Sequence, residues 1–483
     1  MMRHLGASWK LSALTLAVAV GGCGTAPPSP SASVAPSAIP ARTAVPTPAA
    51  SPEPSQTATP APTAAEIAMS DVPRAAAAPA EAKKAAAAIN AFGLDLLRHA
   101  GTPGANVVLS PTSIAIALAM ARAGARGETA AQMDTVMRSA GAEKLANAMN
   151  ALDAALATRS GTFNGMDGSP LDVTLQIANA TFAQQGMPIE RSFLDALAAR
   201  FGTGVRLVDY AADPEAARRV INAWVKKQTE NRIPELLRPP DVTDLTRIAL
   251  VNAIYLKAPW LDPFDPKDTA PGGFTRADGS RVTVPMMHLE SSGLGPNFPV
   301  AIGVGWRAVR LPYLGSRSER YGTDELAMTI IVPDDLTAFE RSLTAGMLAD
   351  LTNAKDAGGQ LDLRKVVLTV PRFSIDARFD LGEALKAMGM PLAFDRQRAD
   401  FTGIATLPEG LYIAKVIHQA NIDVDEKGTE AAAATAVLGA TGGPGDTSKP
   451  VVIRADRPFL FVLTDIPTGA VLFIGRVTDP SAK

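Results

Sequence analysis

The fold is decided by residues 426–437, which read EKGTEAAAATAV. A run typical of a β-strand, residues 413–425, precedes them, and a polar, Gly-rich loop at 439–449 follows them. Every residue from 431 to 437 is small or β-branched, and none is charged or proline. A central strand accepts neither proline nor an unpaired charge. The sequence therefore predicts a loop that can later become a central strand of a sheet.

The alternation of side chains along this segment supports the same interpretation. Because successive side chains of a strand point to opposite faces, counting by two from Thr429 selects the residues expected to face the core. These are all small: Ala431, Ala433, Thr435, Val437 and Gly439. The opposite set contains one charge, Glu430, at the end expected to lie nearest solvent. The alanines alone carry little weight, because four-Ala runs also occur at 75–78 and 85–88.

The residues before the alanines are more specific. Residues 425–430 (DEKGTE) resemble the hinge of the reactive-centre loop in serpins, with Gly428 as a backbone swivel. The resemblance continues in order from about residue 81 to residue 480. Its motifs are NVVLSPTSI at 106–114, Gly124 with Thr129, LVNAIYLK at 250–257 with Trp260, VPMM at 284–287, LPY at 311–313, PRFS at 371–374 followed by Leu381, Leu385 and Met388-Gly389, ADRPFLF at 455–461, and GRV at 475–477.

The resemblance implies an α+β serpin fold, with about nine helices around three β-sheets and an exposed reactive-centre loop. The residue pattern agrees with this fold class. Apolar residues recur at helical spacing early in the chain, at 81–97 and 110–120, whereas continuous apolar runs typical of buried strands come later, at 248–256, 326–332 and 459–463. Helices early and strands late favour an α+β fold over alternating βαβ units.

The resemblance also implies roles for particular residues. The hinge comprises Glu426, Gly428, Thr429, Glu430, Ala431, Ala433 and Thr435, and in the uncleaved loop Thr429 is expected in solvent. Four residues form a hydrogen-bonded cluster under the centre of the main sheet, where it opens: Ser110, Ser113, Asn252 and His418. Lys257 and Trp260 lie where the loop first enters the sheet, and Ala258 and Pro259 depart there from the family pattern.

The function implied by the resemblance is inhibition of serine proteases by a suicide-substrate mechanism. The protease cleaves the loop, the freed segment inserts as a new strand, and the acyl-enzyme is trapped as a covalent complex. A monomer is expected. The alternative is a non-inhibitory binding or chaperone-like protein of the same fold, which a proline or bulky charge in the core-facing set would favour; the sequence has neither. A third hypothesis, a hydrolase, has no motif to support it.

The family spacing places the cleaved bond between Gly442 and Gly443, and bonds after Leu438, Ala440 and Thr441 stay open as alternatives. Small residues favour elastase- or subtilisin-like targets, and Leu438 suits a chymotrypsin-like pocket. A cysteine protease also stays open as a target. No Arg or Lys lies near the expected bond, which argues against trypsin-like proteases.

Composition excludes several other classes of function. The formal net charge is −2, and no run of Lys and Arg is more basic than an ordinary solvated surface. Neither nucleic acid nor a polyanionic cofactor is therefore expected as a partner. The sequence contains no Gly-x-Ser-x-Gly elbow, P-loop, dinucleotide fingerprint or His-Glu-x-x-His pair. No enzyme activity, cofactor or metal is therefore predicted, and His418 is interpreted as a buried structural histidine.

The N-terminal region predicts export and anchoring. Basic residues precede a short apolar stretch at 11–20, which ends in Val20-Gly21-Gly22-Cys23, similar to a bacterial lipobox. Residues 1–22 are therefore predicted as a lipoprotein signal peptide, and Cys23, the only cysteine, as the lipidated residue. An ordinary secretory signal with an incidental cysteine is the alternative. Residues 23–80, rich in Pro, Ala and Ser, are predicted as a disordered tether, and residues 81–483 as a serpin domain at a membrane surface facing the periplasm or cell exterior.

Overall fold

The computed structural model describes residues 64–102, 104–165, 168–291, 296–315, 325–353, 361–430 and 449–482. Within these ranges the chain forms nine α-helices and three β-sheets, which confirms the predicted α+β fold. The helices are α1 (Pro79–His99), α2 (Pro111–Gly124), α3 (Gly127–Val136), α4 (Ala142–Leu156), α5 (Arg191–Phe201), α6 (Pro214–Gln228), α7 (Leu336–Ser342), α8 (Ala345–Asn353) and α9 (Gly382–Met388). Several predicted residues lie outside the described ones: Cys23, Ala431, Ala433, Thr435, Leu438, Ala440, Thr441, Gly442 and Gly443.

The described strands form sheets of eight, seven and four strands. The first sheet has the order β1 (Glu66–Ala68), β5 (Val205–Val208), β4 (Pro170–Gln184), β6 (Ile248–Pro259), β16 (Gly428–Thr429), β15 (Val416–Asp425) and β14 (Phe373–Asp380), and β3 (Gly161–Asn164) pairs with β4 beside this path. The second runs β12 (Leu363–Arg364), β9 (Phe298–Gly303), β10 (Trp306–Pro312), β11 (Leu326–Pro333), β18 (Phe459–Asp465), β19 (Ala470–Val477) and β2 (Val107–Leu109). The third runs β17 (Val451–Arg454), β13 (Val366–Pro371), β8 (Arg281–Glu290) and β7 (Ala270–Thr275).

The main core lies around α2, which packs against β4 and β6 of the first sheet and against β19 of the second. Nearly every residue of α2 is buried, which suits its almost uniformly apolar sequence. Its start is well defined, because Ser110 caps it by accepting a hydrogen bond from the N–H of Ser113, and Pro111 occupies its first turn. Strands β11, β18 and β19 are buried along their whole length, as their continuous apolar runs predict.

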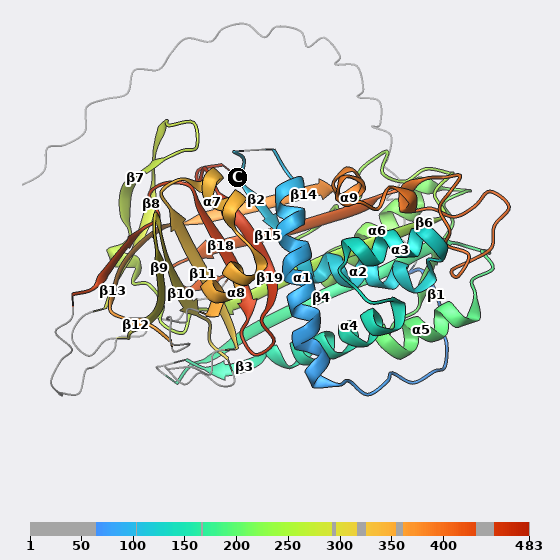
Figure 1. The fold of residues 1–483 in the computed structure, drawn as a ribbon, viewed down its shortest axis with the longest axis horizontal. Helices are drawn as coiled ribbons and strands as arrows, with labels where there is room; N and C mark the ends of the chain where they lie inside the picture. Colours follow the sequence, from blue (N-terminus) through green and yellow to red (C-terminus); the bar gives the residue numbers. More distant parts are fainter. Residues whose placement is uncertain are drawn as a thin grey trace, which may run out of the picture. The chain divides into compact units, whose positions relative to one another are not determined.

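Helix α6 covers part of the first sheet through a second apolar cluster (Figure 1). From the helix, Ala217, Ile221 and Val225 are buried in this cluster. From the sheet, β6 contributes Val251 and β15 contributes Ile417. Helix α6 therefore packs over β4 and β6 of the first sheet, and its apolar cluster extends to β15 at the site described below.

The predicted boundary of the tether is wrong for the residues that the structure describes. Residues 66–68 form β1, which pairs with β5, and the backbone N–H of Ala75 donates to the carbonyl of Ala199. The Ser70 hydroxyl also bonds Asp195. Composition did not predict this strand, because the segment is rich in Pro and Ala and has few large apolar residues. A short edge strand is held mainly by backbone pairing and needs little apolar surface of its own. Among the described residues the first strand begins at Glu66, and α1 begins at Pro79.

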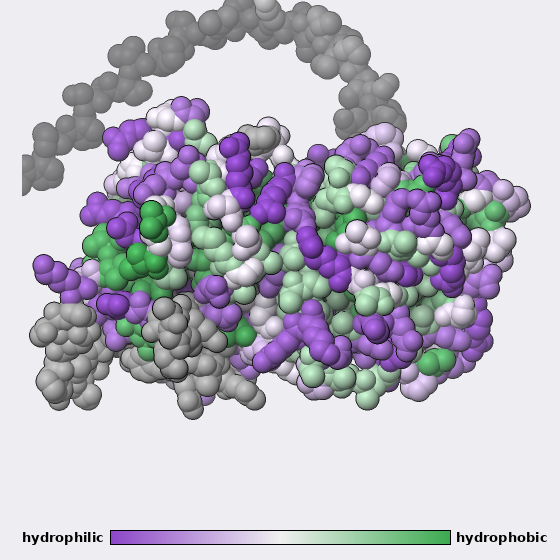
Figure 2. Space-filling view, in the orientation of Figure 1, coloured by the Kyte–Doolittle hydropathy of each residue, from purple (hydrophilic) through white to green (hydrophobic). Residues whose placement is uncertain are grey.

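The surface in view is mainly polar, with apolar residues gathered over the region of β8 to β10 (Figure 2). Ile302 and Val304, around the turn between β9 and β10, are among the exposed large apolar side chains, as is Val452 in β17. Scattered exposed apolar residues are ordinary on soluble folds. No helix within the described ranges has both the length and the hydrophobicity needed to cross a bilayer.

Candidate functional site: the hinge in the first sheet

The described start of the hinge is already part of the first sheet, through Gly428 and Thr429 of β16. Strand β16 pairs antiparallel with β15 on one side, where Thr429 lies opposite Val424, and with β6 on the other, where Thr429 lies opposite Ala258. Further along, β6 and β15 pair directly with each other, residues 250–253 with 416–419. We call the boundary between β6 and β15 the seam. It is wedged apart by β16 at one end and closed at the other.

Gly428 fits the wedge because it has no side chain. Its φ of +153° is one that residues with a Cβ rarely adopt. A Cβ at this position would lie 2.2 Å from the carbonyl oxygen of Ala258 and 2.7 Å from the Cα of Pro259. The backbone of β16 therefore approaches β6 more closely than any other residue would allow, and Ala258 and Pro259 supply the surface that it meets.

Thr429 is buried and hydrogen-bonded, which corrects the expectation that it lies in solvent before cleavage. Its Oγ1 is 2.6 Å from the hydroxyl oxygen of Tyr313. The Tyr313 ring stacks on Trp260, with ring centroids 4.4 Å apart and planes 13° from parallel. Because Thr has a small β-branched side chain with one hydroxyl, it can enter the sheet as soon as a partner is available. Tyr313 is that partner, and its role could not be read from the sequence.

Trp260 holds the hinge from the side of β6. Its indole Nε1 donates to the carbonyl of Asp425 at 3.0 Å, and its backbone N–H donates to the carbonyl of Lys427 at 2.8 Å. The structure thus brings Trp260 to the hinge, where the family resemblance implied that it would lie. Lys257 precedes Ala258 in β6, opposite Thr174 of β4, and is only partly buried.

Glu426 fixes the start of the hinge. One carboxylate oxygen, Oε1, accepts hydrogen bonds from the Thr269 hydroxyl and from Nε of Arg372 at 2.7 Å. Its backbone carbonyl accepts from the N–H of Phe264. Burial disfavours the charged carboxylate, but the hydrogen bonds from Arg372 and Thr269 outweigh it and lower the pKa of Glu426. Glu426 is therefore an ionised anchor at neutral pH.

Glu430 does not lie at the solvent end as predicted. Its side chain is only 2% exposed, and Oε2 lies 3.1 Å from Nε of Arg232, which is itself 45% exposed. The strand alternation failed here because β16 ends at Thr429 and Glu430 has left-handed backbone, with φ of +53°. Burial raises the pKa of Glu430 to about 7; Asp423 and Glu230 add to the rise, whereas Arg232 and Tyr255 oppose it.

The four predicted cluster residues meet at the closed end of the seam, and all four are buried. The N–H of Ser110 donates to Nε2 of His418 at 3.1 Å, so Nδ1 carries the proton and donates to Oδ1 of Asn252 at 2.6 Å. Asn252 in turn donates to the Ser113 hydroxyl. Full burial lowers the pKa of His418 to about 3. His418 is therefore neutral, and both ring nitrogens are used in joining β15 to β6 and to the start of α2.

One member of this cluster was missed by sequence analysis. Asn252 also donates to Oδ1 of Asn179 in β4, at 2.7 Å. Asn179 lies directly opposite Asn252 in the β4–β6 ladder. Its partner could be found only once the register of that ladder was known. The cluster therefore extends across three strands of the first sheet.

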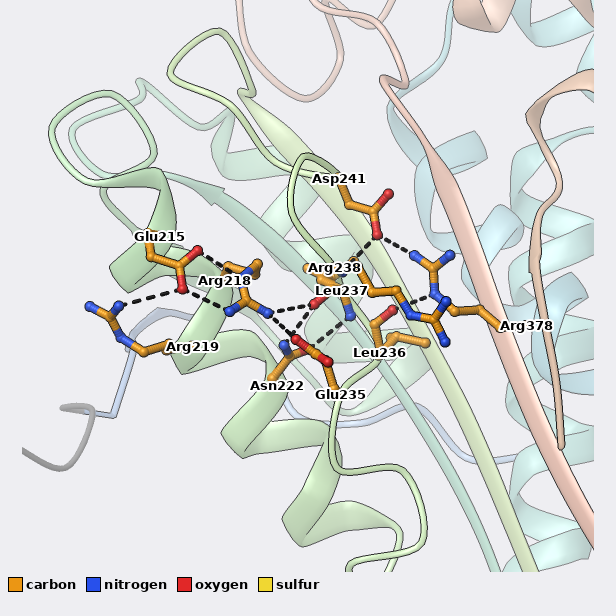
Figure 3. Close-up of polar contacts among 10 residues, drawn as sticks. All are labelled: Glu215, Arg218, Arg219, Asn222, Glu235, Leu236, Leu237, Arg238, Asp241 and Arg378. Carbon is orange, nitrogen blue, oxygen red and sulfur yellow. Dashed lines mark hydrogen bonds and ion pairs between the residues drawn. The ribbon is translucent and has the colours of Figure 1, made fainter. Parts of the chain in front are cut away.

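A chain segment that we call the strap, residues 229–242, connects α6 to the far side of the seam (Figure 3). On the helix side, Asn222 exchanges two hydrogen bonds with the backbone of Leu237, each 2.8 Å long, and Arg218 also bonds that carbonyl. On the sheet side, Arg378 of β14 donates to the carbonyl of Leu236 at 2.7 Å and pairs with Asp241. Helix α6 and strand β14 are thus tied to one surface segment.

We expect Tyr313→Phe to loosen the hinge. The change removes the hydroxyl that bonds Thr429 but keeps the ring that stacks on Trp260. A net loss of about 1 kcal/mol corresponds to roughly a fivefold increase in the undocked population. Amide hydrogen exchange at residues 428–430 should accelerate by that factor. Tyr412→Phe is the control, since no hydrogen bond of its hydroxyl is found among the described residues. Unchanged exchange in Tyr313→Phe would show that the hydroxyl does not hold the hinge.

Docking of the hinge should also depend on pH through Glu430. Its pKa is raised to about 7 when docked, whereas an undocked carboxyl in solvent has its ordinary lower value, so the docked form binds the proton more tightly. Docking is therefore favoured below pH 7 and weakens as the pH rises through 7. Protection factors at residues 428–430, which correct for intrinsic exchange, should fall between pH 6 and pH 8. In Glu430→Gln they should stay level; a wild-type protein with level protection would contradict the assignment.

The comparisons with known proteins identify the family. The family model described as Serpin (serine protease inhibitor) matches residues 87–480. The leukocyte elastase inhibitor of Bos taurus is 34% identical over 396 residues, covering 80% of this chain and 96% of that protein. An uncharacterized serpin-like protein of Thermococcus kodakarensis is 35% identical, covering 81% of this chain and 85% of that protein. The native structure of the thermophilic serpin tengpin shares the fold, with a TM-score of 0.71 at 24% identity, over 86% of this chain and 100% of that one. The chain therefore belongs to the serpin family.

Proposed function

We propose that this protein inhibits serine proteases by inserting its cleaved loop into the first sheet. The observation that carries the proposal is β16, which already occupies the open end of the seam with hydrogen bonds to both neighbouring strands. Cleavage beyond residue 430 would release the following segment to continue β16 along the seam. Insertion would replace the short direct ladder between β6 and β15 with two antiparallel ladders.

The register of β16 tells where each inserted residue would go. Thr429 lies opposite Val424 and Ala258, so an antiparallel continuation places Thr435 opposite His418 on one side and Asn252 on the other. These two residues now face each other directly, joined by the 2.6 Å bond from Nδ1 to Oδ1. Insertion must break that bond, and the Thr435 hydroxyl is a donor and acceptor suited to replace it. The core-facing residues between Thr429 and Thr435, Ala431 and Ala433, are small enough to enter without displacing their neighbours.

The proposed targets follow from the loop and from the relatives. The curated relatives include leukocyte elastase inhibitors, and elastase-like proteases cleave after small residues such as those at 439–443. We place the cleaved bond at Gly442–Gly443, with the bonds after Leu438, Ala440 and Thr441 as alternatives. The product is a covalent acyl-enzyme complex, and each inhibitor molecule acts once.

The test is to mix the protein with elastase, subtilisin and chymotrypsin and look for an adduct that survives SDS. Thr435→Arg should be cleaved at the wild-type rate but form at least tenfold less adduct, because insertion would bury a charge between His418 and Asn252 at a cost of several kcal/mol. Thr447→Arg is the matched control, since it lies beyond the expected bond and does not insert. If the wild-type protein is cleaved without any adduct, the non-inhibitory binding protein replaces this proposal. An adduct from Thr435→Arg at wild-type yield would refute the register.

We further propose that the inhibitor acts at a membrane surface, exported and lipidated at Cys23. A signal-like N-terminus and a single cysteine at the end of the apolar stretch support this location. Several acyl chains on one residue anchor a protein firmly, and the residues between Cys23 and β1 would serve as a tether. Cys23→Ala should release the protein from the membrane fraction, whereas Ser29→Ala should not. Retention of Cys23→Ala on the membrane would disprove the anchor.

A further inference from the structure

A cavity of about 190 Å³ lies between α1 and α4, beside the turn that joins α3 to α4. The two helices lie side by side (Figure 1). The cavity is far from the hinge in the sequence and plays no part in the proposed insertion. Its floor is formed by apolar side chains that are nearly inaccessible to solvent: Ala85, Ile89, Phe92, Leu145, Ala148 and Met149.

The cavity exists because small side chains face each other across the helix pair. Ala85 and Ala88 of α1 meet Ala148 of α4, where larger apolar residues would close the gap. Protein interiors are normally packed as densely as organic crystals, so such a gap forfeits dispersion contacts. An apolar floor offers water no hydrogen-bonding partner, and a cavity of this kind binds apolar molecules. The floor therefore selects an apolar ligand group.

The rim of the same cavity is polar and carries positive charge. The polar side chains of the lining are Glu81, Lys84, Arg138, Ser139 and Lys144. Lys84 pairs with Glu81 at 2.7 Å, and Arg138 pairs with Asp95 of α1. Lys144 makes no ion pair with any residue that the structure describes. The lining therefore carries three cations and one carboxylate, Glu81, and Asp95, which lies outside the lining, is shared between Arg138 and Arg98.

The backbone at the rim is also unusual. Arg138 has φ of +53°, in the left-handed region that a residue with a Cβ seldom occupies. Glycine or asparagine is the ordinary residue at such a position after a helix. Residues held in this region gather at ligand-binding sites. Here the turn places a long cationic side chain at the mouth of an apolar cavity.

We propose that the cavity between α1 and α4 binds a single-chain amphipathic anion, a fatty acid of medium length, with its chain on the apolar floor and its carboxylate at Lys144. The volume holds about six water-sized groups, and a methylene is of similar size. Lys144, which forms no ion pair with any described residue, supplies the positive charge that one carboxylate needs. An ester- or amide-linked acyl chain lacks the charge that Lys144 would meet, which favours the free acid over a membrane lipid or a protein-bound acyl group.

The experiment is calorimetric titration of the full-length protein with the sodium salts of butanoate, hexanoate, octanoate and decanoate. Each methylene that enters the cavity should raise the affinity about fourfold, and the gain should level off near octanoate, when the chain fills the floor. 1-Octanol, which has the chain without the charge, should bind at least tenfold more weakly than octanoate. Absence of octanoate binding, or an affinity that keeps rising in proportion to chain length through decanoate, would overturn the proposal.

Two substitutions separate the floor from the rim. Ala88→Leu should fill the cavity and abolish binding of octanoate and octanol alike, with the thermal midpoint of the unliganded protein preserved. Lys144→Gln should weaken octanoate about tenfold and leave octanol unchanged. Lys83→Gln is the matched control, because Lys83 is exposed on α1 and outside the lining. Octanoate binding that is insensitive to both Ala88→Leu and Lys144→Gln would place the ligand elsewhere. A heparin fragment is the test for a polyanion. If it binds more tightly than octanoate, and if its binding is lost in Lys144→Gln but kept in Ala88→Leu, the rim binds polyanions instead.

Discussion

The rest of the structure depends on the short ladder that closes the seam between β6 and β15. Each of these strands has an outer neighbour paired along most of its length, β4 for β6 and β14 for β15. The direct ladder between them spans only four residue pairs, and at the other end β16 holds them apart. Since each backbone hydrogen bond contributes about 1 kcal/mol net, this ladder is much weaker than the ladders that join β4 to β6 and β14 to β15. This short ladder lies directly beyond β16, where the proposed insertion would take place.

Because the ladder between β6 and β15 is short, the layers on the two faces of the sheet must hold these strands together and still allow them to separate. On one face, the start of α2 is bonded to His418 and Asn252, one from each strand. On the other face, Val251 of β6 and Ile417 of β15 lie in one apolar cluster with residues of α6 and the strap. Apolar contacts such as these are non-directional, so the two strands can slide beneath α6 without a large loss of contact.

The sequence predicted the parts of the site that rest on local pattern. The small residues at alternate positions after Thr429 and the flexible Gly428 follow from the residue pattern. The four cluster residues were implied by the family resemblance, and they lie together in the structure. Hydrogen-bonding partners that reach the site through long-range strand pairing could not be predicted from the sequence. Tyr313 meets Thr429 only because β10 and β6 end beside each other, and Asn179 meets Asn252 only through the register of β4. Docking of the hinge was missed for the same reason, since its stability comes from Trp260, Tyr313 and Arg372.

The two ends of the seam differ in how they respond to protons. At the closed end, His418 is fully buried and its pKa is lowered to about 3, so the bond to Asn252 keeps one protonation state throughout the neutral range. At the open end, the pKa of Glu430 is raised to about 7, so its charge changes within that range. A neutral Glu430 is easily buried, but an ionised one relies on the half-exposed Arg232 for compensation. Alkaline conditions therefore loosen the hinge while the cluster stays intact. In the proposed mechanism the strand enters from the hinge end, so docking of the hinge varies with pH while the far end of the seam stays closed.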